Sequence, residues 1–247
     1  VEEFSGPTTF STDAAIYCVP EDAVPYAYRG PDHDAWLEYI ENYFFYLGER
    51  TRGRVLGLFT NSALVKRIGE RLSPKFRAIG LQLLWQGMPG LSKEEVMRTF
   101  KANHESILLG VDTFWYGVDF PGTTCEHIVI AKLPYGAPDR YMYAQQARLG
   151  YGIQRNTIYL PKALAMFRQG CGRLLRSEDD RGSITILDKR VLDGQHANFL
   201  EELPGGIDEW DKPNIVRAST DECLQHIFKH MGLKADVERR GLGSSFI

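Results

Sequence analysis

The chain has 247 residues, of which 43% are hydrophobic and 25% charged, so it is long enough to bury the core of one large globular domain. Its formal net charge of -3 excludes binding of nucleic acid through a general excess of basic residues, but leaves open a groove of hydroxyls, backbone amides and a few arginines. The four cysteines form no CxxC pair and no apolar run reaches the roughly 20 residues of a membrane span. We therefore expect a cytoplasmic protein with no bound metal and no membrane contact, and the start at Val1 rather than Met suggests a piece of a longer protein.

The first part of the chain alternates apolar runs with amphipathic segments. Residues 14–19 form an apolar run that ends at Pro20, which predicts a strand. From Asp34 onward, apolar residues recur with helical spacing as far as Gly48, which we interpret as the stop signal of a helix. Residues 54–59 are the next predicted strand.

A polar triplet, Thr60, Asn61 and Ser62, follows this second strand where another helix begins. Asn or Ser at this place is typical of a helix N-cap, so capping explains the triplet at least as well as contact with a ligand.

The remaining elements continue the alternation. Further strands are predicted at 78–84, 106–111, 127–131 and 183–187. Further helices are predicted at 92–101, 139–149, 161–176 and 221–231. We expect one domain over residues 1–231 and a partly disordered tail over 232–247.

Helices that alternate with continuously apolar strands predict an α/β fold with a mostly parallel sheet covered by helices on both faces. In such sheets ligands bind at the edge formed by the carboxyl ends of the strands. The loops after strands 54–59, 106–111 and 127–131 should therefore gather at one site.

The helix that Pro161 opens carries Gln169, Arg173 and Arg176 along one stripe, because these residues follow helical spacing. Guanidinium groups suit phosphate oxygens, although a solvated basic face paired with the following acidic residues is an equally simple interpretation. Gly170 within the same helix indicates close approach of another segment.

The sequence contains no phosphate-binding GxxxxGK loop, no GxSxG and no HExxH. Arginines directed at phosphate without a phosphate loop indicate half of a shared site.

Four segments then match one family in order. FRQGCGRLLRSEDDRGSITILDKR at 167–190 resembles motif VI and the following strand of the DinG/XPD-type superfamily 2 helicases, and the similarity is greater to the bacterial DinG branch. Leu58–Ser62 is similar to their motif IV, Thr113–Gly122 to motif V and Leu133–Tyr135 to their LPF. The resemblance implies a RecA-like three-layer fold and the second motor domain of an ATP-dependent 5′ to 3′ DNA helicase used in DNA repair.

The resemblance also implies residue roles at the ATP site. Arg176 would be the finger on the γ-phosphate, Arg173 its partner, and Gln169 would orient the helix or the attacking water. Gly117 and Asp119 would lie near the ribose and couple the nucleotide to DNA, although Asp119 could equally cap a turn.

On the DNA side, Thr60, Asn61 and Ser62 would contact the single-strand backbone, and Trp115 would line the DNA path. A core position is the alternative for Trp115. Tyr116 departs from the family pattern, which usually has Glu there.

The implied cofactors are ATP and Mg in the full-length enzyme, and any iron–sulfur cluster would lie in the amino-terminal half. The implied partners are single-stranded DNA and the first RecA-like domain of the same polypeptide, so this fragment alone should not hydrolyse ATP. Two alternatives stay open: an RNA-directed relative, and a non-catalytic nucleic-acid-binding module that keeps the fold.

Overall fold

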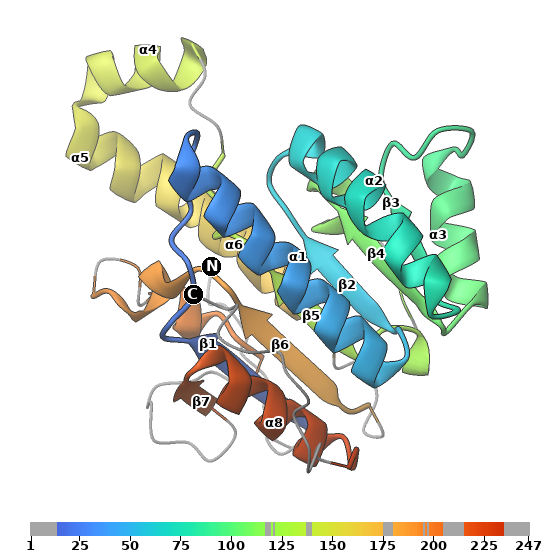
Figure 1. Ribbon diagram of the computed structural model, residues 1–247. Helices are drawn as coiled ribbons and strands as arrows, with labels where there is room; N and C mark the ends of the chain where they lie inside the picture. Colours follow the sequence, from blue (N-terminus) through green and yellow to red (C-terminus); the bar gives the residue numbers. More distant parts are fainter. Residues whose placement is uncertain are drawn as a thin grey trace.

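The computed structural model describes residues 14–116, 120, 122–136, 140–174, 180–194, 196, 198–204 and 215–234 (Figure 1). Within these ranges, seven strands form one parallel sheet in the order β3-β4-β2-β5-β6-β1-β7. The strands are β1 (Ala15–Pro20), β2 (Val55–Leu58), β3 (Gln82–Trp85), β4 (Ser106–Gly110), β5 (His127–Ile130), β6 (Gly182–Ile186) and β7 (Ile215–Ala218). The α-helices are α1 (Pro31–Thr51), α2 (Ser62–Ala78), α3 (Lys93–Ala102), α4 (Arg140–Leu149), α5 (Tyr151–Gln154), α6 (Leu160–Cys171), α7 (Asn198–Glu201) and α8 (Thr220–His230).

Helices cover both faces of the sheet, because alternate strand residues are apolar on each side. Leu56 and Ile128 pack in a core with α3, α6 and α7. Val55 and Val129 pack in a second core with α1, α2 and α8, the three helices on the near face in Figure 1. The predicted three-layer RecA-like α/β fold is therefore confirmed.

Helix α1 does not stop at Gly48, as the sequence predicted, but continues to Thr51. A Cβ at position 48 would lie 2.9 Å from Cε1 of Phe76, so this glycine lets α1 approach α2. The helix instead ends at Arg52, whose φ of 57° lies in the left-handed region and whose N–H bonds to the Gly48 carbonyl.

Two more boundaries differ from the prediction. Helix α2 continues through Pro74 to Ala78, so β3 begins at Gln82 rather than at residue 78. The helix predicted to open at Pro161 is preceded by helical structure that begins at Tyr151. A π-helical turn, Arg155–Tyr159, joins α5 to α6 ahead of Pro161. The wider turn accommodates a proline whose missing N–H would break an ordinary helical ladder.

Strand β7 was not predicted. It is four residues long and pairs with the edge of β1, and its Arg217 side is exposed, so it lacks the buried apolar pattern of the other strands. Residues 1–13 of the predicted domain and residues 235–247 of the predicted tail lie outside the described residues.

Residues 140–159, comprising α4, α5 and the π-helical turn, form an arm that extends from the sheet at the upper left of Figure 1. This arm contains Arg140, Arg148 and Arg155 but no Asp or Glu. In the described part of the chain no helix is long and apolar enough to cross a membrane.

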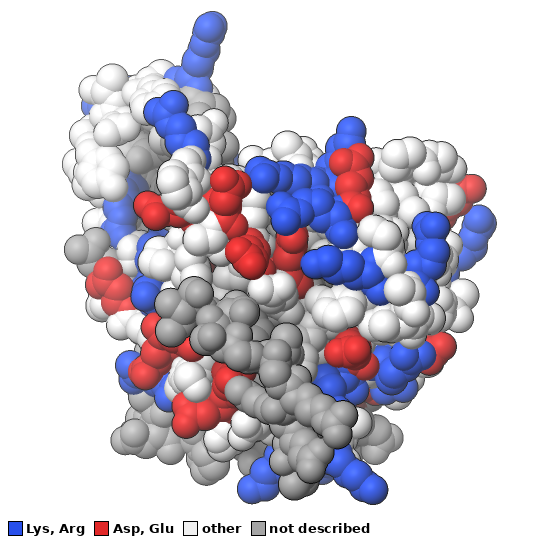
Figure 2. All heavy atoms as spheres, in the orientation of Figure 1, with Lys and Arg blue, Asp and Glu red and all other residues white. Residues whose placement is uncertain are grey.

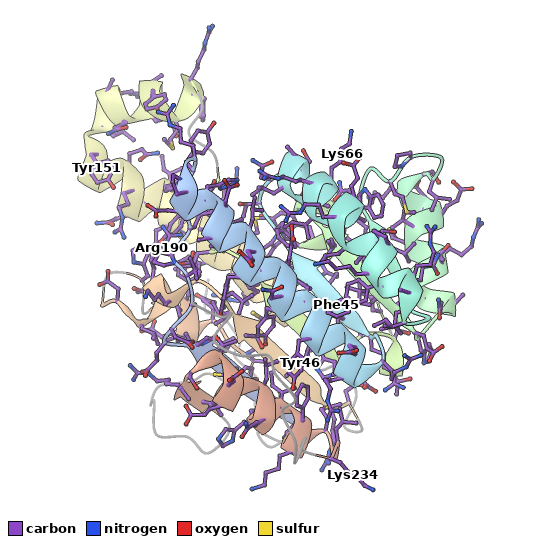
Figure 3. All side chains as sticks on the ribbon, in the orientation of Figure 1. Phe45, Tyr46, Lys66, Tyr151, Arg190 and Lys234 are labelled. Atoms are coloured by element: carbon purple, nitrogen blue, oxygen red, sulfur yellow. The ribbon has the colours of Figure 1, made fainter. Side chains whose placement is uncertain are left out.

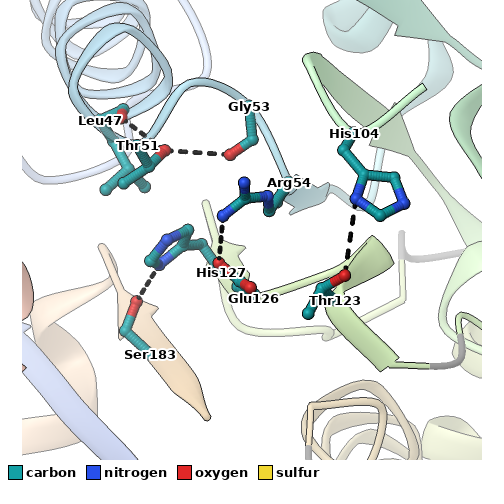
Figure 4. Close-up of polar contacts among 9 residues, drawn as sticks. All are labelled: Leu47, Thr51, Gly53, Arg54, His104, Thr123, Glu126, His127 and Ser183. Carbon is teal, nitrogen blue, oxygen red and sulfur yellow. Dashed lines mark hydrogen bonds and ion pairs between the residues drawn. The ribbon is translucent and has the colours of Figure 1, made fainter. Parts of the chain in front are cut away.

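At the opposite edge, where the strands begin, a buried polar pair ties β5 to β6 (Figure 4). His127 is 1% exposed, and its Nδ1 lies 2.9 Å from Oγ of Ser183. Burial, reinforced by the charges of Arg54 and His230, lowers the pKa of His127 to about 3. The imidazole is therefore a neutral structural group at neutral pH.

We predict that His127 makes the fold sensitive to acid. The unfolded chain binds a proton at His127 below about pH 6.5, whereas the folded chain does not until about pH 3, so stability present above pH 6.5 is lost as the pH falls. Between pH 6.5 and 5 this costs about 2 kcal/mol at about 1.4 kcal/mol per unit. Urea unfolding of the parent chain and of His127→Gln at several pH values measures the difference, and equal pH dependences would contradict it.

Candidate functional site

The loops that follow β2, β4, β5 and β6 gather at the carboxyl edge of the sheet, as the topology requires. Backbone hydrogen bonds link them directly: the N–H of Phe59 donates to Gly110, that of Ala131 to Leu58 and that of Leu187 to Ile130. Segments far apart in the sequence therefore end at one surface.

The polar triplet after β2 caps α2, as the simpler interpretation predicted. Oδ1 of Asn61 accepts hydrogen bonds from the N–H groups of Ala63 at 2.8 Å and Leu64 at 3.3 Å. Asn61 and Ser62 are exposed and Thr60 is half-buried. The capping role leaves the outer faces of these side chains directed to solvent, where a ligand can reach them.

Trp115 is the centre of this edge rather than part of its surface. Its side chain is 0% exposed, and its Nε1 donates a 2.7 Å hydrogen bond to the carbonyl of Phe59 at the end of β2. The expectation that the Trp115 ring lines a DNA path therefore does not fit this structure, because a fully buried indole cannot stack on a base. The alternative of a core aromatic is the one observed.

Arg173 is also buried, at 5% exposure, and its Nη2 donates a 2.7 Å hydrogen bond to the carbonyl of Trp115. The helical stripe predicted through Gln169, Arg173 and Arg176 does not reach this position, since α6 ends at Cys171 and the Arg173 side chain is buried. Burial lowers the pKa of the Arg173 guanidinium from its ordinary value. The structure thus joins the motif V segment to the motif VI segment through Arg173 and Trp115.

Of the other residues expected at an ATP site, the structure describes only one. Gln169 is exposed near the end of α6. Arg176, Gly117 and Asp119 lie outside the described residues.

Two adjoining cavities of about 420 and 450 Å³ lie between the arm and the carboxyl edge. Both are lined by Thr60, Tyr135 and Tyr159. The first cavity also takes Asn61 and three cationic side chains, Lys132, Arg155 and Arg190. The second takes Tyr116, the residue that departs from the family pattern, which is 41% exposed.

A buried carboxylate fixes the loop after β5 in this wall. Oδ2 of Asp188 accepts from the N–H of Leu133 at 3.0 Å and from Nη2 of Arg190 at 2.6 Å, and Oδ1 accepts from Nε of Arg190 at 2.8 Å. Burial alone would raise the pKa of Asp188, but the hydrogen bonds and charge of Arg190 hold it below its usual range. Lys132 and Arg190 were not among the predicted site residues; their signal is their position in the segments that follow β5 and β6.

Gly170 confirms the expected close approach. A Cβ there would lie 2.7 Å from Cε3 of Trp115 and 2.9 Å from Cδ1 of Leu58. We predict that Gly170→Ala costs about 1–3 kcal/mol of stability through overpacking. Gly152, where an added Cβ would meet nothing within 4 Å, is the matched control and Gly152→Ala should cost nothing. Chemical denaturation of both variants measures this, and equal stabilities would contradict the packing.

Comparison with known proteins identifies the family of this chain. The profile of the helicase C-terminal domain family matches residues 45–206. The chain is 38% identical over 174 residues to 3′-5′ exonuclease DinG of Bacillus subtilis (strain 168), covering 68% of this chain and 19% of that protein. It is 35% identical over 161 residues to ATP-dependent DNA helicase YoaA of Escherichia coli (strain K12), covering 63% of this chain and 24% of that protein. The chain therefore spans about a fifth to a quarter of these relatives.

Solved structures agree on the fold. An XPD helicase superposes with a TM-score of 0.61 at 18% identity, over 82% of this chain and 35% of that chain. Saccharomyces cerevisiae Dbp5 bound to RNA and ADP BeF3 superposes with a TM-score of 0.54 at 14% identity, over 90% of this chain and 46% of that chain. The family profile covers most of the chain, from α1 to the segment after α7, and the relatives are DinG and YoaA proteins. The chain belongs to the helicase C-terminal domain family, of the DinG/XPD type within superfamily 2.

Proposed function

We propose that this chain is the carboxy-terminal motor domain of an ATP-dependent DNA helicase that moves 5′ to 3′ along single-stranded DNA. The main support for the proposal is that three motif segments meet at one residue. Trp115 donates a hydrogen bond to the carbonyl of Phe59, and its own carbonyl accepts one from Arg173. A motor must couple nucleotide state to the strand, and this contact provides a rigid connection between segments assigned to those two tasks.

The ATP site of the proposed motor is shared with the first RecA-like domain of the same polypeptide, which also supplies the phosphate loop and the Mg ligands. Arg176 acts as the finger on the γ-phosphate, and Gln169, exposed near the end of α6, orients the helix or the attacking water. Gly117 and Asp119 lie near the ribose. Arg173 supports this site from within, because its guanidinium holds the Trp115 carbonyl.

The DNA side of the motor is the carboxyl edge. Thr60, Asn61 and Ser62 contact the backbone of the strand at the mouth of the first cavity, whose wall carries Lys132 and Arg190. Cations and hydroxyls at a groove supply affinity without reading sequence.

Two alternatives have some support. Contacts to phosphate do not distinguish DNA from RNA, so an RNA-directed motor has the same groove; the name of the Escherichia coli relative, a DNA helicase, favours DNA. The Tyr116 departure favours a non-catalytic binding module, whereas Gln169, Arg173 and Arg176 are all present in the sequence and favour a working motor.

We predict that Arg176→Ala in the full-length protein lowers DNA-stimulated ATP hydrolysis by roughly 10³- to 10⁵-fold, the effect of losing such a finger in related systems. ATP binding should persist, and Arg176→Lys should rescue poorly because it loses the two-pronged geometry. Steady-state ATPase with saturating single-stranded DNA measures this.

The matched control is Arg168→Ala. Arg168 is an exposed arginine on α6 that pairs with Glu202, and its loss should leave turnover near normal. Near-normal turnover of Arg176→Ala would contradict the motor assignment, as would ATPase activity of residues 1–247 alone.

A further inference from the structure

The first cavity combines aromatic rings with cations. Its wall holds five tyrosines, Tyr26, Tyr28, Tyr135, Tyr151 and Tyr159, and the cations Lys132, Arg155 and Arg190. Among the described residues that line it there is no Asp or Glu. At about 420 Å³ it falls within the size range of small-molecule sites.

Two of these rings form one aromatic wall. The rings of Tyr135 and Tyr159 are stacked, with centroids 5.4 Å apart and planes 25° apart. The hydroxyl of Tyr159 donates to the carbonyl of Gly136, which fixes its ring, and Arg190 lies 5.9 Å from the ring centre of Tyr135. The Tyr135 hydroxyl is buried and has no hydrogen-bond partner among the described residues, so the wall offers a polar atom to a bound group.

Lys132 supplies positive charge next to this wall. Its Nζ lies 3.7 Å from the ring centre of Tyr26, a contact that holds the ammonium in place but does not neutralise it. Burial, followed by the nearby charge of Arg190, lowers the pKa of Lys132. An anion in the cavity would offset both effects.

The arm adds to this positive character. It carries three arginines and no acidic residue in a chain of net charge -3, and Figure 2 shows blue and white atoms on it. Figure 3 shows Tyr151 on α5 of the arm and Arg190 below it in this view, near the carboxyl edge, so the cavity has walls from two separate parts of the fold.

We propose that this cavity holds one unstacked nucleotide of the bound strand, with its base against the Tyr135–Tyr159 wall and its phosphate at Lys132. The inference rests on the proposed single-strand function and adds a subsite to it. Base–aromatic stacking tolerates any base, because every base has a π-face, so the pocket grips the strand without selecting sequence.

The test compares the binding of two labelled oligonucleotides of about 12 nucleotides, a length typical of single-strand sites. One is made of thymidines, and the other has the same backbone but no bases. Residues 1–247 should bind the thymidine strand more tightly than the abasic strand. Tyr159→Leu should lose about 5- to 150-fold in affinity for the thymidine strand, the range that stacking is worth, with no change for the abasic strand. Tyr159→Phe keeps the ring and should keep the preference.

A matched control is Tyr143→Leu. Tyr143 is 58% exposed on α4 of the same arm and lines neither cavity, so its loss should change neither affinity. Lys132→Met should lower the affinity for both strands equally. It should also reduce the slope of log affinity against log salt concentration by about 0.7, the value of one single-strand phosphate contact. Lys66→Met, on the exposed surface of α2, should leave that slope unchanged.

The outcomes separate the two proposals. The nucleotide pocket would be overturned if the parent chain bound both strands equally, or if Tyr159→Leu lowered the affinity for both strands equally. Either result would leave the proposed single-strand function standing. Binding of neither strand would overturn both. Displacement of the thymidine strand by thymidine monophosphate at equal nucleotide concentration would assign the cavity to a free nucleotide and overturn its place on the strand.

Discussion

The carboxyl edge depends on one buried indole. Trp115 donates to the carbonyl of Phe59, which directly follows β2, accepts from Arg173 through its own carbonyl, and packs its ring against Gly170. An unpaired polar group at such depth would cost about 1–3 kcal/mol, so each bond also holds its partner segment in place. Three segments, each more than fifty residues from the next along the chain, therefore have one relative arrangement.

This arrangement changes how the arginines are interpreted. Arg173 is committed to the Trp115 carbonyl from a position with 5% exposure, so in the proposed motor it positions the site from beneath while exposed Gln169 lies at the surface. A change at one segment is transmitted to the others through a packed core, which deforms little. The same core supports the wall of the cavity, since Thr60 directly follows Phe59.

Much of the fold could be predicted from the sequence because it depends on local patterns. The alternation of apolar strands with amphipathic helices indicated a covered parallel sheet. The helix predicted at 92–101 is α3, where Ser92 and Glu95 form a capping box at the start. Gly48 was misread because its reason is a neighbour, Phe76, that the sequence does not place beside it. Arg173 was misplaced because helical spacing assigns a face but cannot show that α6 ends two residues earlier. Trp115 was assigned to the DNA path by resemblance alone, and the core position left open as the alternative is the one observed. The cavity combines residues from the arm and from the segments that follow β1, β2, β5 and β6, so no single stretch could predict it.

In the proposed motor, single-stranded nucleic acid binds at the carboxyl edge of this sheet. Hydrogen–deuterium exchange of residues 1–247, with and without a saturating thymidine oligonucleotide, tests it most directly because it maps protection along the chain. We expect slower exchange at residues 60–64, 132–136 and 154–159, with no change at residues 52–54 and 104–106 on the opposite edge. Protection confined to that opposite edge, or no protection under conditions where binding is saturated, would contradict it.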